Sequence, residues 1–147
     1  MIKLRFLTGE ALPEGPWLVA FLLAVTKAGD IGAYAAGSLF GRHTLIRRIS
    51  PSKTWEGLAG GLLFSLGAAL ALRPVFSQVP VVHLATLGLV LGILGQLGDL
   101  SESLIKRDCQ VKDSGTLLPG MGGVLDVLDS LLFTAPIGYF YMDKFFV

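Results

Sequence analysis

The stretch GDLSESLIKRDCQVKDSGTLLPGMGGVLDVLDS, residues 98–130, carries most of the polar chemistry of the chain and lies between long apolar runs. Two acidic pairs lie in it, Asp99 with Glu102 and Asp126 with Asp129. Each pair has i, i+3 spacing, so in a helix both carboxylates project from one face. Two such faces form an oxygen-rich pocket for Mg²⁺, which combines one or two protein carboxylates with water and substrate phosphate. The pattern therefore predicts a magnesium site built from these four residues.

The segment between the two acidic pairs predicts phosphate binding. Lys106, Arg107 and Lys112 supply positive charge that can neutralise the phosphates carried by such a metal. The loop LPGMGG, residues 118–123, brings a glycine-rich backbone to the start of the next helix, where free N–H groups favour anions. Metal, cations and open amides together describe a phosphate site.

The composition of the chain indicates a membrane protein. Of its 147 residues 52% are apolar, and the mean hydropathy of +0.67 is high for a soluble domain. The uncharged run at residues 74–98 is long enough to cross the hydrocarbon core, which takes about 20 residues. We expect an all-α integral membrane protein with about four transmembrane helices, at residues 17–41, 57–72, 74–98 and 123–142.

The distribution of charge predicts how these spans are oriented. With four spans, the loops after the first and third lie on one side and carry most of the basic residues, namely Arg42, Arg47, Arg48, Lys53, Lys106, Arg107 and Lys112. By the positive-inside rule these loops are cytoplasmic. We therefore expect a protein of the cell (inner) membrane with catalytic loops facing the cytoplasm. The formal net charge of +1 argues against nucleic acid as a partner.

Two charges interrupt the first span. Lys27 and Asp30 lie inside an otherwise apolar segment, which we expect to form one long helix or two half-helices. A charge that faces lipid is costly, so Asp30 is expected to face the protein interior and to serve function. The alternative is a purely structural ion pair between Lys27 and Asp30 at a helix end.

The second span follows a short basic loop. Ser50 followed by Pro51 is typical of a helix N-cap with proline in the first helical position, so we expect the second helix to start there. Gly57 and Gly61 give this helix a face of small residues that allows close helix packing. The basic residues of the loop can also serve only to keep it in the cytoplasm.

Two blocks of the sequence resemble the phosphatidate cytidylyltransferases, also called CDP-diacylglycerol synthases. The first block contains DIGAY (30–34), the stretch 37–41 and SPSKTWEG (50–57). The second contains SLIKR (103–107), KDSG (112–115), LPG (118–120), GG (122–123) and DVLD (126–129). The sequence differs from the usual family pattern at Met121, where His is common, and at Val127, where Arg is common. The resemblance covers nearly all of the chain from about Trp17 onward.

The resemblance implies a membrane nucleotidyltransferase of phospholipid biosynthesis that converts CTP and phosphatidate to CDP-diacylglycerol and pyrophosphate. It implies Mg²⁺ with a monovalent cation such as K⁺, a homodimer, and a single membrane domain, residues 1–147, that corresponds to the C-terminal catalytic half of the family without additional N-terminal helices. The residues expected to catalyse are Asp99, Asp126, Lys106, Arg107 and Lys112. Those expected to bind substrate are Asp30, Ser50, Lys53, Thr54, Asp113, Gly122 and Gly123. Glu102 and Asp129 are expected to complete or orient the metal site of Asp99 and Asp126.

Two other functions stay open on the sequence. A transporter or channel could use intramembrane carboxylates to move protons or cations, although it leaves the basic residues and the glycine loop of the central stretch without a role. A non-catalytic or truncated remnant of the family agrees with Met121 and Val127, and with the expectation that family members carry several further N-terminal membrane helices.

Overall fold

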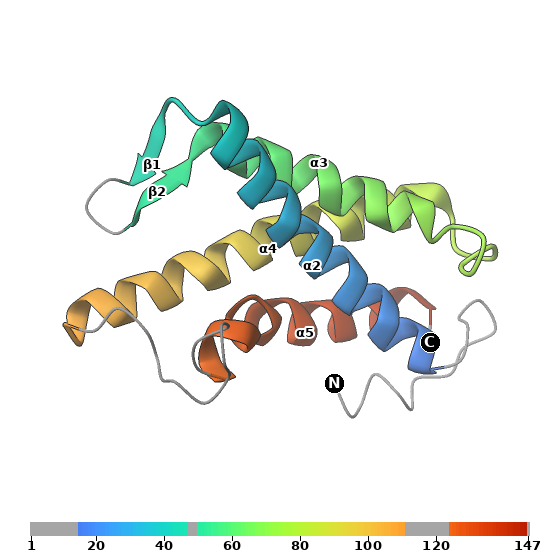
Figure 1. Cartoon of the computed structure of the whole chain (residues 1–147). Coiled ribbons are helices and arrows are strands. Elements are labelled where there is room, and N and C mark those ends of the chain that lie inside the picture. Colours follow the sequence, from blue (N-terminus) through green and yellow to red (C-terminus); the bar gives the residue numbers. More distant parts are fainter. Residues whose placement is uncertain (1–14, 47–49, 111–123, 147) are drawn as a thin grey trace.

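The computed structural model describes residues 15–46, 50–110 and 124–146. This part of the chain is mostly helical, as predicted, and contains four long helices and one β-hairpin (Figure 1). The elements in chain order are α2 (Gly15–Phe40), β1 (Thr44–Ile46), β2 (Ser50–Thr54), α3 (Trp55–Ala71), α4 (Val81–Asp108) and α5 (Val124–Phe146). The hairpin is an addition to the predicted all-α architecture.

Two of the described helices are long and apolar enough to cross a membrane, namely α2 with 26 residues and α4 with 28. α3 is also apolar but has only 17 residues. α2 is one continuous helix through Lys27 and Asp30, so of the two expected forms the single long helix is the one found. α4 continues past residue 98, and Asp99 therefore lies within a helix and not at its end.

The prediction that Ser50 and Pro51 start a helix is wrong. Both residues belong to β2, which pairs antiparallel with β1. α3 starts at Trp55, and its N-cap is Thr54, whose Oγ1 accepts a hydrogen bond from the Gly57 N–H at 3.1 Å. The Ser-Pro pattern misled because the proline ring also suits extended backbone at a sheet edge, and the residue before proline favours extended backbone.

Glycines allow α2 and α3 to pack closely. A Cβ on Gly32 of α2 would lie 2.5 Å from the side chain of Phe64, and a Cβ on Gly60 of α3 would lie 2.3 Å from the Cβ of Ala36. Both distances are far below van der Waals contact, so larger residues would force the helices apart. Gly57 and Gly61, the predicted small face of α3, lie in the same contact.

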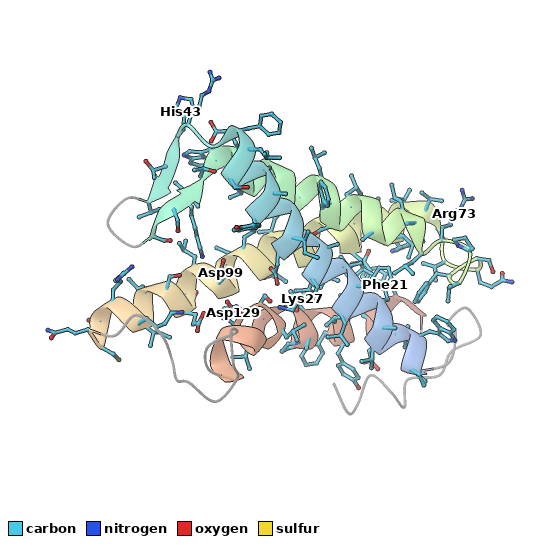
Figure 2. The ribbon with its side chains drawn as sticks, in the orientation of Figure 1. Phe21, Lys27, His43, Arg73, Asp99 and Asp129 are labelled. Carbon is cyan, nitrogen blue, oxygen red and sulfur yellow. The ribbon has the colours of Figure 1, made fainter. Side chains whose placement is uncertain are left out.

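The apolar core lies in the half of the bundle away from the hairpin (Figures 1 and 2). It includes Leu18, Phe21, Leu22 and Val25 of α2 and Leu84, Leu87 and Leu91 of α4, all nearly fully buried. Phe76, from the turn between α3 and α4, closes it against Phe21 with ring centroids 4.9 Å apart. Asp99 lies in the other half of the bundle, towards the hairpin (Figure 2).

Buried hydroxyl groups connect three helices near the middle of the bundle. The hydroxyls of Thr26 in α2 and Thr134 in α5 lie 3.4 Å apart. The Ser65 hydroxyl of α3 donates to the carbonyl oxygen of Val25 in α2 at 3.3 Å. Since all three hydroxyl-bearing side chains are buried, these contacts satisfy polar groups that have no access to water.

Candidate metal and phosphate site

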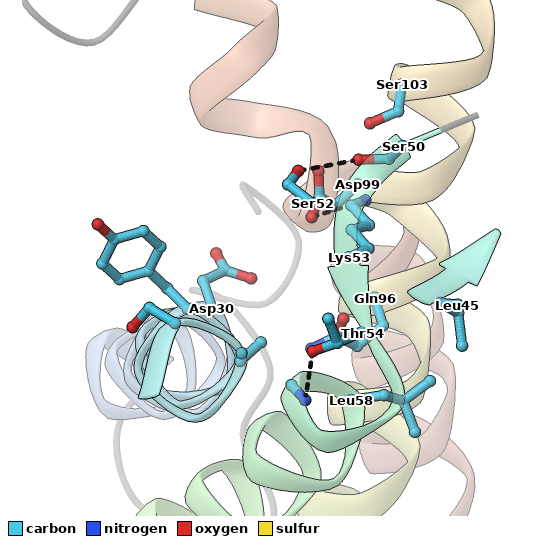
Figure 3. Close-up of a pocket in the computed structure, with 15 residues that line it drawn as sticks. Asp30, Leu45, Ser50, Ser52, Lys53, Thr54, Leu58, Gln96, Asp99 and Ser103 are labelled. Atoms are coloured by element: carbon cyan, nitrogen blue, oxygen red, sulfur yellow. Dashed lines mark hydrogen bonds and ion pairs between the residues drawn. The ribbon is translucent and has the colours of Figure 1, made fainter. Parts of the chain in front are cut away.

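A cavity of about 490 Å³ opens between α2, the hairpin, α3 and α4 (Figure 3). Its wall is mainly polar on the side of the hairpin and α4, whereas Ala33, Leu45 and Leu58 supply apolar surface. Five predicted site residues line it, namely Asp30, Ser50, Lys53, Thr54 and Asp99. The helices and the hairpin thus bring together five predicted residues from distant parts of the sequence, from Asp30 in α2 to Asp99 in α4.

Three carboxylates converge beside this cavity. Asp99 and Glu102 of α4 and Asp129 of α5 each offer an oxygen within 4.8 Å of the other two. Glu102 and Asp129 are buried, with 6% and 8% exposure, whereas the Asp99 side chain is 44% exposed and reaches the cavity. Opposite ligands of Mg²⁺ lie about 4.2 Å apart, so a hard divalent cation fits this all-oxygen donor set.

Two lysines offset the charge of the carboxylates. Lys53 Nζ of β2 lies 2.8 Å from Asp99 Oδ2, and Lys106 Nζ of α4 lies 3.3 Å from Glu102 Oε1. Carboxylates this close repel one another, and the adjacent ammonium groups offset part of that repulsion. Figure 3 shows Lys53 reaching from the hairpin towards Asp99 across the cavity wall. Lys53, which lines the cavity, is therefore placed where a phosphate group in the cavity would meet positive charge.

The remaining predicted site residues do not line the cavity or lie outside what the structure describes. Arg107 lies one residue beyond Lys106 in α4 and is exposed. Asp126 belongs to α5, one turn before Asp129, but its side chain lies outside the part that the structure describes. The others lie outside the described residues altogether, and they are Lys112, Asp113, Gly122 and Gly123.

Asp30 has contacts that agree with both of the interpretations left open by the sequence. It forms the predicted ion pair with Lys27, at 2.9 Å, and it also lines the cavity. The hydroxyl of Ser130 in α5 donates to Asp30 Oδ2 at 3.3 Å and lies 3.4 Å from Lys27 Nζ. Because Ser130 directly follows Asp129, this network fastens α2 to α5 beside the carboxylates (Figure 2).

An exposed hydrogen bond between two side chains links the hairpin to α3. His43 Nδ1, just before β1, lies 2.6 Å from Glu56 Oε1 in the first turn of α3. The hydrogen bond with the His43 side chain is the largest cause that lowers the pKa of Glu56 from 4.5 to about 2. Together with the Thr54 cap, this pair fixes both ends of the hairpin that carries Lys53.

Several residues of the cavity wall are not among the predicted ones. Gln96 and Ser103 line it from α4, and Tyr34 lines it from α2. Gln96 precedes Asp99 by three positions and Ser103 follows it by four, so helical spacing places all three on one face. That spacing, applied outward from Asp99, is the signal that could have found Gln96 and Ser103.

Comparison with known proteins relates this chain to a group of enzymes. The sequence model of the cytidylyltransferase family matches residues 2–145. The chain is 43% identical over 128 residues to a phosphatidate cytidylyltransferase of Bacillus subtilis, covering 86% of this chain and 48% of that protein. It is 44% identical over 137 residues to a phosphatidate cytidylyltransferase of Synechocystis, covering 90% and 45%.

A third relative carries no activity in its name. The chain is 45% identical over 128 residues to the uncharacterized protein YnbB of Escherichia coli, covering 87% of this chain and 43% of that protein. The chain thus spans slightly less than half the length of these curated relatives.

Proposed function

The chain belongs to the cytidylyltransferase family, and on this premise we propose that it forms the metal-binding and phosphate-binding part of a phosphatidate cytidylyltransferase. The family resemblance predicted from the sequence is thereby confirmed. The observation that carries the proposal is the meeting of Asp99, Glu102 and Asp129 beside a cavity in which Lys53 supplies positive charge. Such a site suits a substrate that brings both a divalent cation and phosphate groups.

The proposed reaction joins CTP to phosphatidate. An oxygen of the phosphatidate phosphate attacks the α-phosphorus of CTP, a new P–O–P linkage forms, and pyrophosphate leaves. The attacking oxygen is already ionised at neutral pH, so the reaction needs no dedicated general base. Catalysis then depends on positioning the two phosphates and neutralising their charge.

The residues of this chain divide that work between them. Lys53 and Lys106 neutralise phosphate oxygens, while the hydroxyls of Ser50 and Thr54 contact the nucleotide or the lipid head group from the cavity wall. When bound at Asp99, Glu102 and Asp129, with Asp126 as a further ligand, Mg²⁺ would polarise the nucleotide phosphate and support the leaving pyrophosphate. The parts assigned to Arg107, Lys112, Asp113, Gly122 and Gly123, and the monovalent cation, remain predictions.

We propose that all four helices span the membrane. Each exposes large apolar side chains, for example Ile31 of α2 at 63%, Leu63 of α3 at 68%, Val82 of α4 at 74% and Phe140 of α5 at 64% exposure. Such surface suits contact with lipid. The positive-inside rule then favours a cytoplasmic position for the end that bears the hairpin and the cavity. The single membrane domain over residues 1–147 and the homodimer remain predictions.

The membership of the family favours this function over the transporter. A transporter would use the intramembrane carboxylates to carry ions. The relatives whose names state an activity are phosphatidate cytidylyltransferases, and Lys53 and Lys106 place positive charge beside the carboxylates, where phosphate groups would need it. The non-catalytic remnant is left to experiment.

The test is CDP-diacylglycerol formation by the purified chain in detergent with CTP, phosphatidate and Mg²⁺. Asp99→Asn is compared with Asp108→Asn, which changes an exposed carboxylate at the end of the same helix. We expect Asp99→Asn to lower kcat/KM by about 100-fold or more, because it removes a charge from the metal site. We expect Asp108→Asn to stay within about twofold.

Full activity in Asp99→Asn would contradict the proposed site. If the chain alone is inactive, the same pair of variants is made in a version extended upstream of Met1. Activity there would show that the site needs further residues, whereas inactivity in both versions would favour the non-catalytic remnant.

A further inference from the structure

α4 and α5 approach each other closely at Gly98. A Cβ on this buried glycine would lie 2.7 Å from the carbonyl oxygen of Asp129 and 3.0 Å from the Cα of Ser130. Both are backbone atoms, so no side-chain rotation could relieve the overlap. Any residue larger than glycine would therefore require α5 to move away from α4 at this level.

This contact places the backbone of Asp129, a residue of the proposed metal site, directly against Gly98. Gly98 directly precedes Asp99, and the atom nearest to its missing Cβ belongs to Asp129. Asp99 and Glu102 lie on one helix, so their spacing does not depend on α5. The position of Asp129 relative to both does depend on the separation of α4 and α5.

From this geometry we infer that Gly98 is a positioning residue for the carboxylate cluster. It lets α5 come close enough for Asp129 to share a cation with Asp99 and Glu102, an inference that rests on the metal site of the proposed function. A metal site tolerates displacements of only about 0.5 Å in its ligands, and a methyl group at Gly98 would demand more than that of α5. The absence of a side chain at residue 98 thus sets the position of Asp129 without any contact between Gly98 and the metal.

Gly95 offers a matched control one turn away on the same helix. It also faces α5, but a Cβ there would lie 3.6 Å from Thr26, 3.8 Å from Ser130 and 4.0 Å from Thr134, each time from a side-chain carbon. These are ordinary van der Waals distances. Gly95→Ala therefore makes the same chemical change in the same helix and leaves α5 in place.

The experiment measures Mn²⁺ binding to the purified chain by electron paramagnetic resonance of the free ion, with Mg²⁺ as competitor and without CTP or lipid. We expect Gly98→Ala to raise the Kd for Mn²⁺ by about tenfold or more, as for other changes just outside a metal's ligands. We expect Gly95→Ala to stay within about twofold. Thermal unfolding of both variants in the same detergent reports whether the bundle is intact.

A double variant separates positioning from general packing. Asp129→Asn removes the ligand through which Gly98 acts, so Gly98→Ala should weaken Mn²⁺ binding by no more than about twofold further in that background. An equal loss in both backgrounds would overturn the inference, because Gly98 would then affect the cluster in some other way. Failure of Gly98→Ala to fold while Gly95→Ala folds would also overturn it, since the contact would then support the whole bundle.

The outcomes distinguish this inference from the proposed function. If the wild-type chain binds Mn²⁺ and Gly98→Ala binds it equally well, the inference fails and the metal site stands. If the wild-type chain does not bind Mn²⁺, the metal site and the inference fail together. If binding depends on Gly98 but no CDP-diacylglycerol forms, the inference stands and the proposed reaction fails.

Discussion

Lys53 is the residue that connects the hairpin to the carboxylates of α4. Its Nζ lies 2.8 Å from Asp99 Oδ2 while its strand forms part of the cavity wall. We expect Lys53→Met to raise the KM for CTP by about tenfold, because a charged hydrogen bond to phosphate contributes about 1.5–3 kcal/mol. Steady-state kinetics at saturating Mg²⁺ measures this.

Lys144→Met is the control for Lys53→Met. Lys144 is an exposed lysine in the last turn of α5, at the other end of the bundle from the hairpin. Its replacement should leave the KM for CTP unchanged. Equal KM values for Lys53→Met and the wild-type chain would show that Lys53 serves Asp99 alone and does not meet the nucleotide.

The pair of His43 and Glu56 gives a prediction about pH. The pKa of Glu56 lies below its unfolded value of 4.5, at about 2. The contribution of this carboxylate to stability is therefore fully present above pH 4.5 and is lost as the pH falls through about 2. Carbon-13 NMR of the labelled Glu56 carboxyl, assigned with Glu56→Gln, should show titration near pH 2 in the wild-type chain. In His43→Ala the titration should move up towards pH 4.5, and an unchanged midpoint would exclude His43 as the main cause.

For single residues, the sequence predicted which side chains lie together only where both belong to the same helix. The spacing of Asp99 and Glu102 placed both carboxylates on one face, and the structure brings both to the cluster with Asp129. The contact of Lys53 with Asp99 spans two helices and a turn, and no local pattern predicts such a partner. The roles of these carboxylates in metal binding and of Lys53 in phosphate binding remain predictions.

The helices themselves follow from apolar runs and glycine spacing, whereas the hairpin does not. Residues 50–54, SPSKT, show neither alternating apolar residues nor a turn signal for strand pairing. This strand is held by contacts with other parts of the chain, namely its pairing with β1, the hydrogen bond of its last residue Thr54 with α3, and the nearby contact of His43 with Glu56. Tertiary contacts of this kind override local propensity, so the sequence alone favoured a helix start.

The contact between α2 and α3 leads to a prediction at the element scale. A Cβ on Gly60 would lie 2.3 Å from Ala36 and 2.8 Å from the carbonyl oxygen of Gly32, whereas Gly67 in the same helix has no neighbouring atom within 4 Å. We expect Gly60→Ala to destabilise the chain by about 1–3 kcal/mol through overpacking. We expect Gly67→Ala to be neutral or to stabilise by up to about 1 kcal/mol through helix propensity.

Thermal unfolding followed by circular dichroism in one detergent compares the two variants. The midpoint should fall for Gly60→Ala and should hold or rise for Gly67→Ala. Equal midpoints would mean that α3 can shift along α2 without cost, and that the glycine contact does not determine how closely these helices pack.

For the whole molecule, the single cysteine gives a test of orientation. Cys109 is exposed just after α4, at the end of the bundle that we propose to face the cytoplasm. In intact cells it should resist a membrane-impermeant maleimide and should react after the membrane is permeabilised. As the opposite marker, Ser77→Cys in a Cys109→Ser background should react from outside, because Ser77 lies exposed in the turn between α3 and α4. Labelling of Cys109 in intact cells would reverse the proposed topology.

The buried hydroxyls between the helices have a consequence for how the protein sits in bilayers of different thickness. The pairs of Thr26 with Thr134 and of Ser65 with the Val25 carbonyl match at one axial position only. A slide of α2 by one helical turn, about 5.4 Å, would break both. The position of Asp30 beside Ser130 along the helix axis is thus fixed by contacts within the protein. A bilayer whose thickness does not match the helices would therefore tilt the whole bundle as a unit and leave the cavity intact.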